Sequence, residues 1–166
     1  MAQTINLNQF KLAHEVGEVD LTFFGGENIL SVLIDPTETS TDEYTPGMGV
    51  TLVDLAGSDQ VGIPIVHKRT LNSQAIFGVI KRSTKWSKAY PGQTVEIALA
   101  GCPMWFNSVA GANRGAKVSL DVANPGNILA STVNRATLGV VIDKIAANSL
   151  GRVLIQADGV TAGTST

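Results

Sequence analysis

Two segments of this chain resemble each other closely enough to constrain the fold. Residues 90–101 read YPGQTVEIALAG and residues 149–159 read SLGRVLIQADG; in each, a glycine opens a short run of alternating residues that ends on another glycine. Upstream of each lies a second similar pair, AIFGVIKRS from Ala75 and ATLGVVIDK from Ala136. Repetition at a near-constant spacing is typical of duplicated structural units. The chain is therefore predicted to contain two related halves.

The spacing of the matched glycines supports this prediction. The matched positions are Gly47 with Gly115, Gly78 with Gly139, and Gly101 with Gly159. The last two separations are similar, at 61 (139 minus 78) and 58 (159 minus 101) residues. The half-repeats are placed at about 47–101 and 115–159. Valine-rich strands bounded by glycine also look alike by chance, so this alternative stays open.

Alternation of apolar and polar residues with period two marks the half-buried strands. It occurs at 19–23, 61–65, 95–99 and 118–122, with turn clusters such as YPGQ and NPGN between such runs. Pro64 cannot donate a hydrogen bond to a sheet, so its strand is expected at an edge or at a bulge. Helix signals are weak, the best being at 69–74 and 133–137. The pattern predicts an all-β barrel or sandwich of short strands.

Residues 1–46 do not join the repeat. They contain the acid-rich stretch DPTETSTDEYTPG, expected to be an exposed loop or linker, after ENILSVLID, which is apolar enough to be a strand in need of a partner. We therefore predict an N-terminal arm or hairpin with an acidic linker at 1–46, followed by a β-barrel-like domain at 47–166. The start of the chain lacks a basic patch leading into an apolar run, and no segment approaches membrane-spanning length, so a soluble protein is expected.

Charge is unevenly distributed along the chain. Residues 1–59 hold ten carboxylates and one basic residue, whereas residues 60–166 hold four carboxylates and eleven basic residues. Two interpretations remain open: the two parts attract each other within one fold, or the molecule is bipolar and is steered onto a charged partner. Charged residues make up only 16% of the chain, which suits a protein that lies against other proteins.

The sequence offers no pattern that predicts catalysis. His14 and His67 lie in no recognisable motif, and Glu15 and Glu18 beside His14 are weak indicators of a metal site. Cys102 is the only cysteine, which excludes an intramolecular disulfide and favours a small buried side chain. No phosphate-binding loop, dinucleotide fingerprint or zinc-protease motif occurs. We expect a protein that is not an enzyme and that holds no cofactor or metal.

Two clusters are candidates for contact with a partner. In KRSTKWSKAY, four basic residues interleave with Trp86 and Tyr90, as in proteins that bind single-stranded nucleic acid, although a basic loop can equally dock on an acidic protein surface. In CPMWFN, three bulky residues follow one another and cannot all face one core, so at least one is exposed or contacts a partner, unless the N-terminal arm covers it. The candidate interface residues are Phe10, Phe23, Phe24, Trp86, Tyr90, Met104, Trp105 and Phe106.

The glycine-flanked strands, with Gly78-Val79-Ile80 and Gly139-Val140-Val141 leading to PGQTVEIALAG, resemble the capsid decoration, or cement, proteins of tailed bacteriophages. The resemblance covers about residues 47–160, and the second unit lacks PGQ. It implies a structural virion protein on the capsid exterior, made in the bacterial cytoplasm, that clamps neighbouring major capsid subunits. It also implies a homo-oligomer, with a trimer favoured. The absence of a long apolar segment and the slightly acidic overall charge argue against a membrane or nucleic-acid partner. We expect the arm and one barrel end to hold the shell.

Two alternatives belong to other classes. Another β-rich virion component, such as a tail or head-fibre protein, would have the same composition. A module that binds glycans or single-stranded nucleic acid would use Trp86, Tyr90 and Trp105 as stacking platforms.

Overall fold

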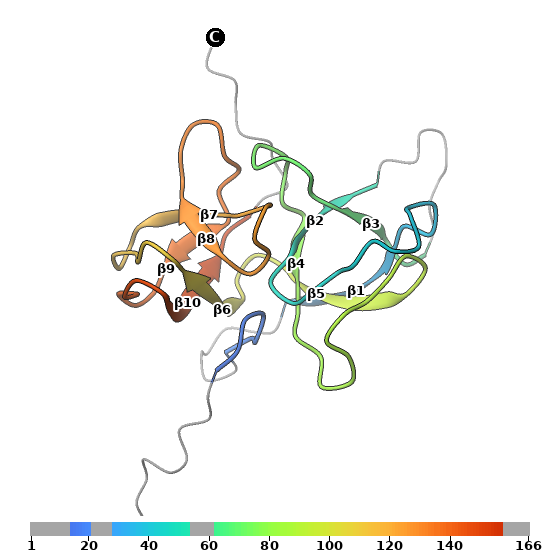
Figure 1. Cartoon of the computed structure of the whole chain (residues 1–166), viewed down its shortest axis with the longest axis horizontal. Coiled ribbons are helices and arrows are strands. Elements are labelled where there is room, and N and C mark those ends of the chain that lie inside the picture. The colour runs from blue at the N-terminus through green and yellow to red at the C-terminus, as the bar shows by residue number, and fades with distance from the viewer. Residues whose placement is uncertain (1–13, 21–27, 54–61, 158–166) are drawn as a thin grey trace, which may run out of the picture.

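The computed structural model describes residues 14–20, 28–53 and 62–157, and this part of the chain is all-β, with ten strands and no helix. The strands lie in two lobes, β1 to β5 in one and β6 to β10 in the other (Figure 1). Their bounds are β1 Ile29–Ile34, β2 Gly49–Leu52, β3 Ile65–Lys68, β4 Gly78–Ile80, β5 Thr94–Ala98, β6 Pro103–Ser108, β7 Lys117–Leu120, β8 Ile128–Ala130, β9 Gly139–Val141 and β10 Ser149–Ile155.

The first half is a closed barrel with the strand order β1-β3-β2-β4-β5. All its neighbours are antiparallel except β1 and β3, which pair in parallel through Leu33 with Ile65 and Ile34 with Val66. Alternate residues of each strand point into the barrel and are fully or almost fully buried. The interior residues are Val32, Ile34, Tyr44, Val50, Val66, Ile80, Ala89, Val95 and Ile97.

The second half repeats this topology strand by strand. Its sheet order is β6-β10-β9-β7-β8. The closed barrel read in the other direction from β1 is β1-β5-β4-β2-β3, so each strand of the second half has the place of the strand five earlier. The parallel closure between β1 and β3 is reduced here to one bridge between Asn107 and Asn127. The second half is therefore the same barrel with an almost open seam between β6 and β8.

The register of the two halves also agrees residue by residue. Val79 pairs with Ala98 in the first half, and Val140 pairs with Leu154 in the second. The turn before β2 and the turn before β7 close with the same hydrogen bonds, from Gly47 to Ile80 and from Gly115 to Val141. The prediction of two related halves is confirmed.

The register also matches a glycine with a different residue. Because Ala98 corresponds to Leu154, Gly92 corresponds to Asn148. Gly159, the predicted match of Gly101, lies outside the described residues. Gly92 has a φ of 83° and Asn148 a φ of 56°. Asparagine tolerates the left-handed conformation better than most residues, so it replaces glycine in this turn.

The boundary at residue 47 is also corrected. Ile29–Ile34, predicted to lie in an arm, form β1, which pairs along its length with β5 and in parallel with β3. The half-repeats therefore begin with β1 and β6 and not near 47 and 115. The reason is that an apolar strand with two unpaired edges gains its backbone hydrogen bonds most simply inside the sheet.

An apolar core joins the two halves. Val79 and Ile80 are neighbours on β4, yet Ile80 faces the barrel interior whereas Val79, with Ile76 and Ala98, packs with the interior residues of the second half. These strands are buried on both faces, which explains why consecutive residues are apolar. Cys102, in the short connection between the halves, is fully buried in the same core, as predicted.

The loop at 69–74, predicted as a helix, is a turn that ties the halves together. Asn72 accepts a hydrogen bond from the backbone N–H of Val122 at 3.0 Å through its side chain, and from that of Ala136 at 2.8 Å through its carbonyl. Arg69 is buried beneath this turn and donates to the carbonyls of Gln74 and Asn72. Burial lowers the pKa of Arg69 to about 10, which still leaves it cationic at neutral pH. The other helix candidate, at 133–137, is likewise not helical.

Residues 14–20 lie across both halves. Val19 bridges Met104 of β6, and the backbone of Gly17 bonds to Trp105 in the second half and to Arg82 in the first. Figure 1 shows this short segment, in dark blue, beside β6 below the junction of the two lobes. The segment therefore acts as a backbone clamp across the junction.

Pro64 directly precedes β3, where its missing N–H breaks no hydrogen bond in the strand. Its carbonyl accepts a hydrogen bond from Leu33 at 2.9 Å, at the start of the parallel pairing of β1 with β3. Ile65 to Lys68 then pair on both sides, with β1 and β2. The strand is thus not at an edge. The proline lies immediately before it, where no hydrogen bond of the strand needs its missing N–H.

Candidate functional site

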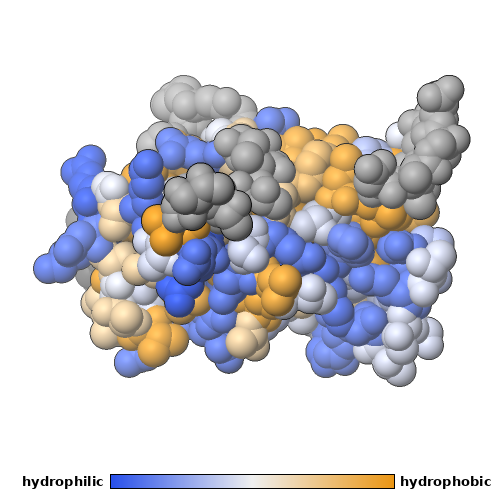
Figure 2. Space-filling view, turned by 90° about the horizontal axis from the view of Figure 1, so that it is seen from above, coloured by the Kyte–Doolittle hydropathy of each residue, from blue (hydrophilic) through white to orange (hydrophobic). Residues whose placement is uncertain are grey.

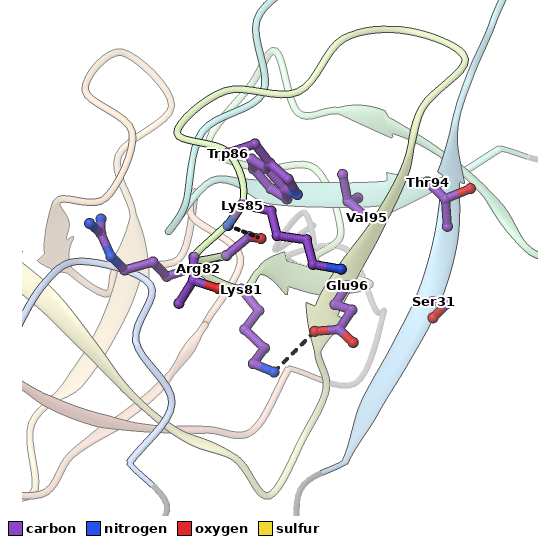
Figure 3. A pocket seen from close by; sticks show the side chains of 10 residues that line it. Ser31, Lys81, Arg82, Lys85, Trp86, Thr94, Val95 and Glu96 are labelled. Atoms are coloured by element: carbon purple, nitrogen blue, oxygen red, sulfur yellow. Dashed lines mark hydrogen bonds and ion pairs between the residues drawn. The ribbon is translucent and has the colours of Figure 1, made fainter.

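The segment KRSTKWSKAY forms a loop over the outside of the barrel, between β4 and β5. A groove of about 450 Å³ lies there, lined by the loop residues 81–86, by Thr94 to Glu96 of β5 and by Ser31 of β1. In Figure 3, Trp86 and Lys85 lie along the groove, whereas the guanidinium group of Arg82 points away from it. The loop thus brings one indole ring and one amino group to a shallow polar groove.

Three of the four basic side chains in this loop form ion pairs within the chain. Lys81 binds Glu96 at 3.0 Å, Lys88 binds Glu43 at 2.7 Å and Arg82 pairs with Glu15. The hydrogen bond and charge of Glu43 raise the pKa of Lys88. Within the described residues, Lys85 has no carboxylate partner. The groove therefore offers one ammonium group to a partner.

The two aromatic residues of this loop differ in exposure. Trp86 is half-buried because it packs against the apolar core of the barrel. Tyr90 is 37% exposed, and its backbone N–H is held by the side chain of Gln93 at 2.9 Å. Of the two predicted contact residues, Tyr90 has the more accessible ring.

In CPMWFN, the period of the strand separates the three bulky residues. Met104 and Phe106 are fully buried in the core of the second half, so their prediction as interface residues is corrected. Trp105 points outward from the sheet and stacks on His14, with ring centroids 4.0 Å apart and an interplanar angle of 9°. The N-terminal segment at 14–20 therefore covers this tryptophan, which was the structural interpretation left open by the sequence.

A cluster of three charged residues completes this covered face. Arg152 on β10 donates to Asp20 at 2.8 Å and to Asp143 at 2.6 Å, and its guanidinium carbon lies 5.9 Å from the centre of the Trp105 ring. Hydrogen bonds to Asp143 and then to Asp20 raise the pKa of Arg152 above its ordinary value. This cluster fixes residues 14–20 on the second half, so little of the Trp105 side chain is accessible to a partner.

The uneven charge of the sequence is partly balanced inside the fold. The ion pairs between an acidic residue before position 60 and a basic residue after it are Glu15 with Arg82, Asp20 with Arg152, Asp42 with Lys68, and Glu43 with Lys88. They link segments that are far apart in the chain. These pairs support the interpretation that the two parts attract each other within one fold.

The acid-rich segment at 35–47 is not a free linker. Tyr44 within it is fully buried in the barrel, where its hydroxyl accepts the N–H of Lys68 at 2.8 Å and donates to Glu38. Burial, followed by the hydrogen bond to Glu38, raises the pKa of Tyr44 above its ordinary value. The segment thus closes one end of the barrel with a tyrosine ring.

The remaining candidates from the sequence have simpler positions. His67 lies on β3, opposite Thr51, and His14 hydrogen-bonds to Glu18 at 3.3 Å. Among the described residues, no three His, Cys, Asp or Glu side chains gather as a metal ion would require. The same residues include no helix long and apolar enough to cross a membrane. Phe10, Phe23 and Phe24 lie outside the described residues.

Sequence reasoning missed an apolar surface on two corresponding loops. Leu71, in the loop between β3 and β4, is 60% exposed, and Val133, in the loop between β8 and β9, is 72% exposed. The loops are joined by the hydrogen bond between Asn72 and Ala136 and project on the same side of the molecule (Figure 1). Figure 2 views that side and shows apolar areas among polar ones. The sequence feature that could have indicated this surface is an aliphatic residue within a polar turn in both halves.

Comparisons with known proteins identify a similar structure but no family. No known protein family and no curated protein sequence matches the chain. Among solved structures, the chain is similar to the N base of the head fibre protein gp8.5 of bacteriophage phi29, at 9% sequence identity and a TM-score of 0.47. The similarity covers 80% of this chain and 96% of that one.

Proposed function

We propose that this chain is a structural, non-enzymatic protein of a tailed-bacteriophage virion that binds the exterior of the head and stabilises contacts between major capsid subunits. The class of partner rests on the resemblance of the glycine-flanked strands to capsid decoration proteins. The observation that carries the binding role is the pair of exposed aliphatic side chains, Leu71 and Val133, at the ends of two joined loops. A partner that covers them gains the free energy of apolar burial.

The electrostatics of the chain support a stable scaffold for such a contact. Four ion pairs join carboxylates of the N-terminal part to basic groups of the remainder, so these charges are already paired when a partner covers the surface. Small contacts of modest affinity become strong when a homo-oligomer, which we propose to be a trimer, binds a repeating lattice at several points.

Cosedimentation with expanded, undecorated phage heads tests the proposal. The purified protein should bind saturably at a fixed stoichiometry per capsid subunit, and the double variant Leu71→Ser, Val133→Ser should bind at least tenfold more weakly. Ile63→Ser is the matched control, because Ile63 is also an exposed aliphatic residue, at 51%, but lies outside these loops. Absence of binding by the folded wild-type protein would contradict the proposed role and favour a fibre or tail component.

A deletion that tests the role of the N-terminal segment has to end before residue 14. Removal of residues 1–46 would delete β1 and the clamp at 14–20, and would therefore unfold the barrel. Deletion of residues 1–13 leaves every described element in place. If the N-terminal segment holds the shell, this shorter deletion abolishes binding while the cooperative unfolding of the barrel is unchanged; unchanged binding refutes that part of the proposal.

A further inference from the structure

The second half contains an apolar cavity at the place where the first half holds Tyr44. The cavity has a volume of about 460 Å³ and is enclosed by the ends of β6, β7 and β8 and by the loop at 109–113. Val118 and Ile128 form its buried floor. Pockets that bind small ligands typically measure about 300–1,000 Å³, and a dry apolar cavity of about 150 Å³ already accepts benzene. The cavity is therefore large enough for an aromatic ring.

The matched register explains why the cavity exists. Four side chains at this end of the first barrel are replaced by smaller ones in the second half. The replacements are Ile34 by Ser108, Tyr44 by Ala112, Met48 by Ala116, and Lys68 by Ala130. Ala112 is identified as the counterpart of Tyr44 because each forms an isolated antiparallel bridge to the same turn, Tyr44 with Ala89 and Ala112 with Ile145.

The cavity also has an open side. In the first half the N–H of Asp35 donates to Val66 at 2.9 Å, which closes the seam between β1 and β3. In the second half the corresponding N–H belongs to Val109, which makes no such bond to Ile128, and Val109 is 56% exposed. The loop that carries Tyr44 runs from residue 35 to 43, whereas its counterpart runs only from 109 to 111. In the first half the ring of Tyr44 is the plug that fills the barrel end. The second half therefore lacks both this plug and the loop that positions it.

One basic side chain lines the cavity and two more lie in the segments beside it; together these three are called the cationic rim. Lys117 lines the cavity, Arg114 lies in the adjoining turn, and Lys144 lies on the other side of the loop at 110–113. All three side chains are exposed, and none has a carboxylate partner within the described part of the chain. In the first half, by contrast, the plug comes with Glu38, Asp42 and Glu43, and the last two pair with lysines of the barrel. A segment that fills the second half would meet unpaired positive charge.

We infer that this cavity binds an aromatic side chain, of about the size of tyrosine, carried by an acidic segment of a partner protein. The segment would do for the second half what residues 35–47 do for the first: its ring fills the barrel end, and its carboxylates meet the cationic rim. The unpaired N–H of Val109 at the open seam gives its backbone a hydrogen-bond donor. This inference is independent of the proposed role in the virion.

NMR titration of the full chain tests the inference. The probes are N-acetyl-L-tyrosine, neutral N-acetyl-L-tyrosinamide, and a synthetic peptide with the sequence of residues 35–47 together with its tyrosine-to-alanine form. We expect saturable shifts of the amide signals around Val109, Ala112 and Ile128, with a Kd on the order of 1 mM for the single amino acid, as ligands of this size commonly show. At low salt the anionic probe should bind several-fold more tightly than the neutral one, and 0.5 M salt should reduce that difference.

Two filling variants and one charge variant make the test specific. Ala112→Phe and Ala130→Leu each occupy part of the cavity and should abolish the shifts, whereas Lys117→Glu should weaken only the anionic probe and the peptide. The inference fails if no probe gives saturable shifts, if the filled variants bind as the wild type does, or if the anionic and neutral probes bind equally. Binding of the amino acids without binding of the peptide would show a small-molecule site and would also overturn it. An alanine peptide that binds as well as its tyrosine form would exclude the ring as the bound group.

Discussion

The buried ring of Tyr44 allows a quantitative test of how the first barrel is held closed. Its hydroxyl accepts the N–H of Lys68 and donates to Glu38, and the side chain has no exposed surface. Tyr44→Phe keeps the ring but leaves the N–H of Lys68 and the carboxylate of Glu38 without this partner. Since an unsatisfied buried donor costs about 1–3 kcal/mol, we expect the free energy of unfolding to fall by that amount.

Tyr44→Ala should have a larger effect, because it removes the ring as well. Truncation of a buried aromatic side chain to alanine typically costs about 3–5 kcal/mol, and the surrounding strands of a closed barrel have little freedom to collapse into the space. Tyr90→Phe is the control, since Tyr90 is exposed and lies outside the barrel; its effect should stay within about 0.5 kcal/mol.

Urea unfolding monitored by tryptophan fluorescence measures these changes in each half. Trp86 packs on the core of the barrel and Trp105 on the second half, so the variants Trp105→Phe and Trp86→Phe leave one reporter each. Because Ile76, Val79 and Ala98 of the first half share a core with the second, both reporters should give one midpoint, and Tyr44→Ala should lower both together. A loss below about 1 kcal/mol for Tyr44→Ala, which is well short of the expected cavity cost, would refute the assignment of Tyr44 as the plug.

The same residue predicts a dependence on pH. In the unfolded chain a tyrosine ionises near pH 10. In the fold, burial and the bond to Glu38 raise the pKa of Tyr44, so the ring stays neutral there. The stabilisation by Tyr44 is therefore complete below about pH 10 and decreases above it, as the unfolded state loses its proton first. The difference in unfolding free energy between wild type and Tyr44→Phe should shrink between pH 9 and 11; parallel curves would contradict this reasoning.

Three further substitutions test other parts of the fold by the same urea titration. Gly139→Ala should cost about 1–3 kcal/mol or more, because its Cβ would lie 1.9 Å from the carbonyl oxygen of Leu154, on backbone that cannot move aside; an unchanged stability would refute this packing. Asn148→Gly should raise stability by up to about 1 kcal/mol, since it relieves the left-handed φ of 56°. Asp20→Asn should cost about 1–3 kcal/mol, because it weakens the nearly buried pair with Arg152 that holds the N-terminal segment; an unchanged value would show that the clamp does not depend on it.

The features that the sequence predicted correctly are those written into local patterns. Alternating residues predicted the strands around Val95 and Val118, and recurring glycines predicted two related halves. Gly78 and Gly139 recur for a shared physical reason: a Cβ at either would lie within 3.1 Å of the carbonyl oxygen of the matching residue on the neighbouring strand, Ala98 or Leu154. The glycines that recur in the sequence are thus positions at which the neighbouring backbone leaves no room for a side chain in either half.

The features that the sequence could not predict depend on pairs of residues far apart in the chain. The strands β1 and β6 occupy the same place, but the inward residues are Leu30, Val32 and Ile34 in one and Met104, Phe106 and Ser108 in the other, so ILSVLI and PMWFNS show no detectable repeat. Exposure of Trp105 could not be judged either, because the residue that covers it, His14, is far from it in the sequence and lies outside the strand pattern at 19–23.

The interiors of the two halves differ in one way in the middle of the barrel and in another way at the barrel end. In the middle of the second half, a glycine at 151 makes room for Ile145, whereas the first half has Val95 and Ala89 at these positions, so total volume is nearly maintained. At the barrel end the compensation is small: Tyr44 becomes Ala112, and among the buried cavity residues only Ile128 is larger than its counterpart, Val66. A cavity left with so little compensation lowers stability. A duplicated unit that repacked its middle had the same means available at its end, so the empty end is better explained by an external ring than by imperfect packing.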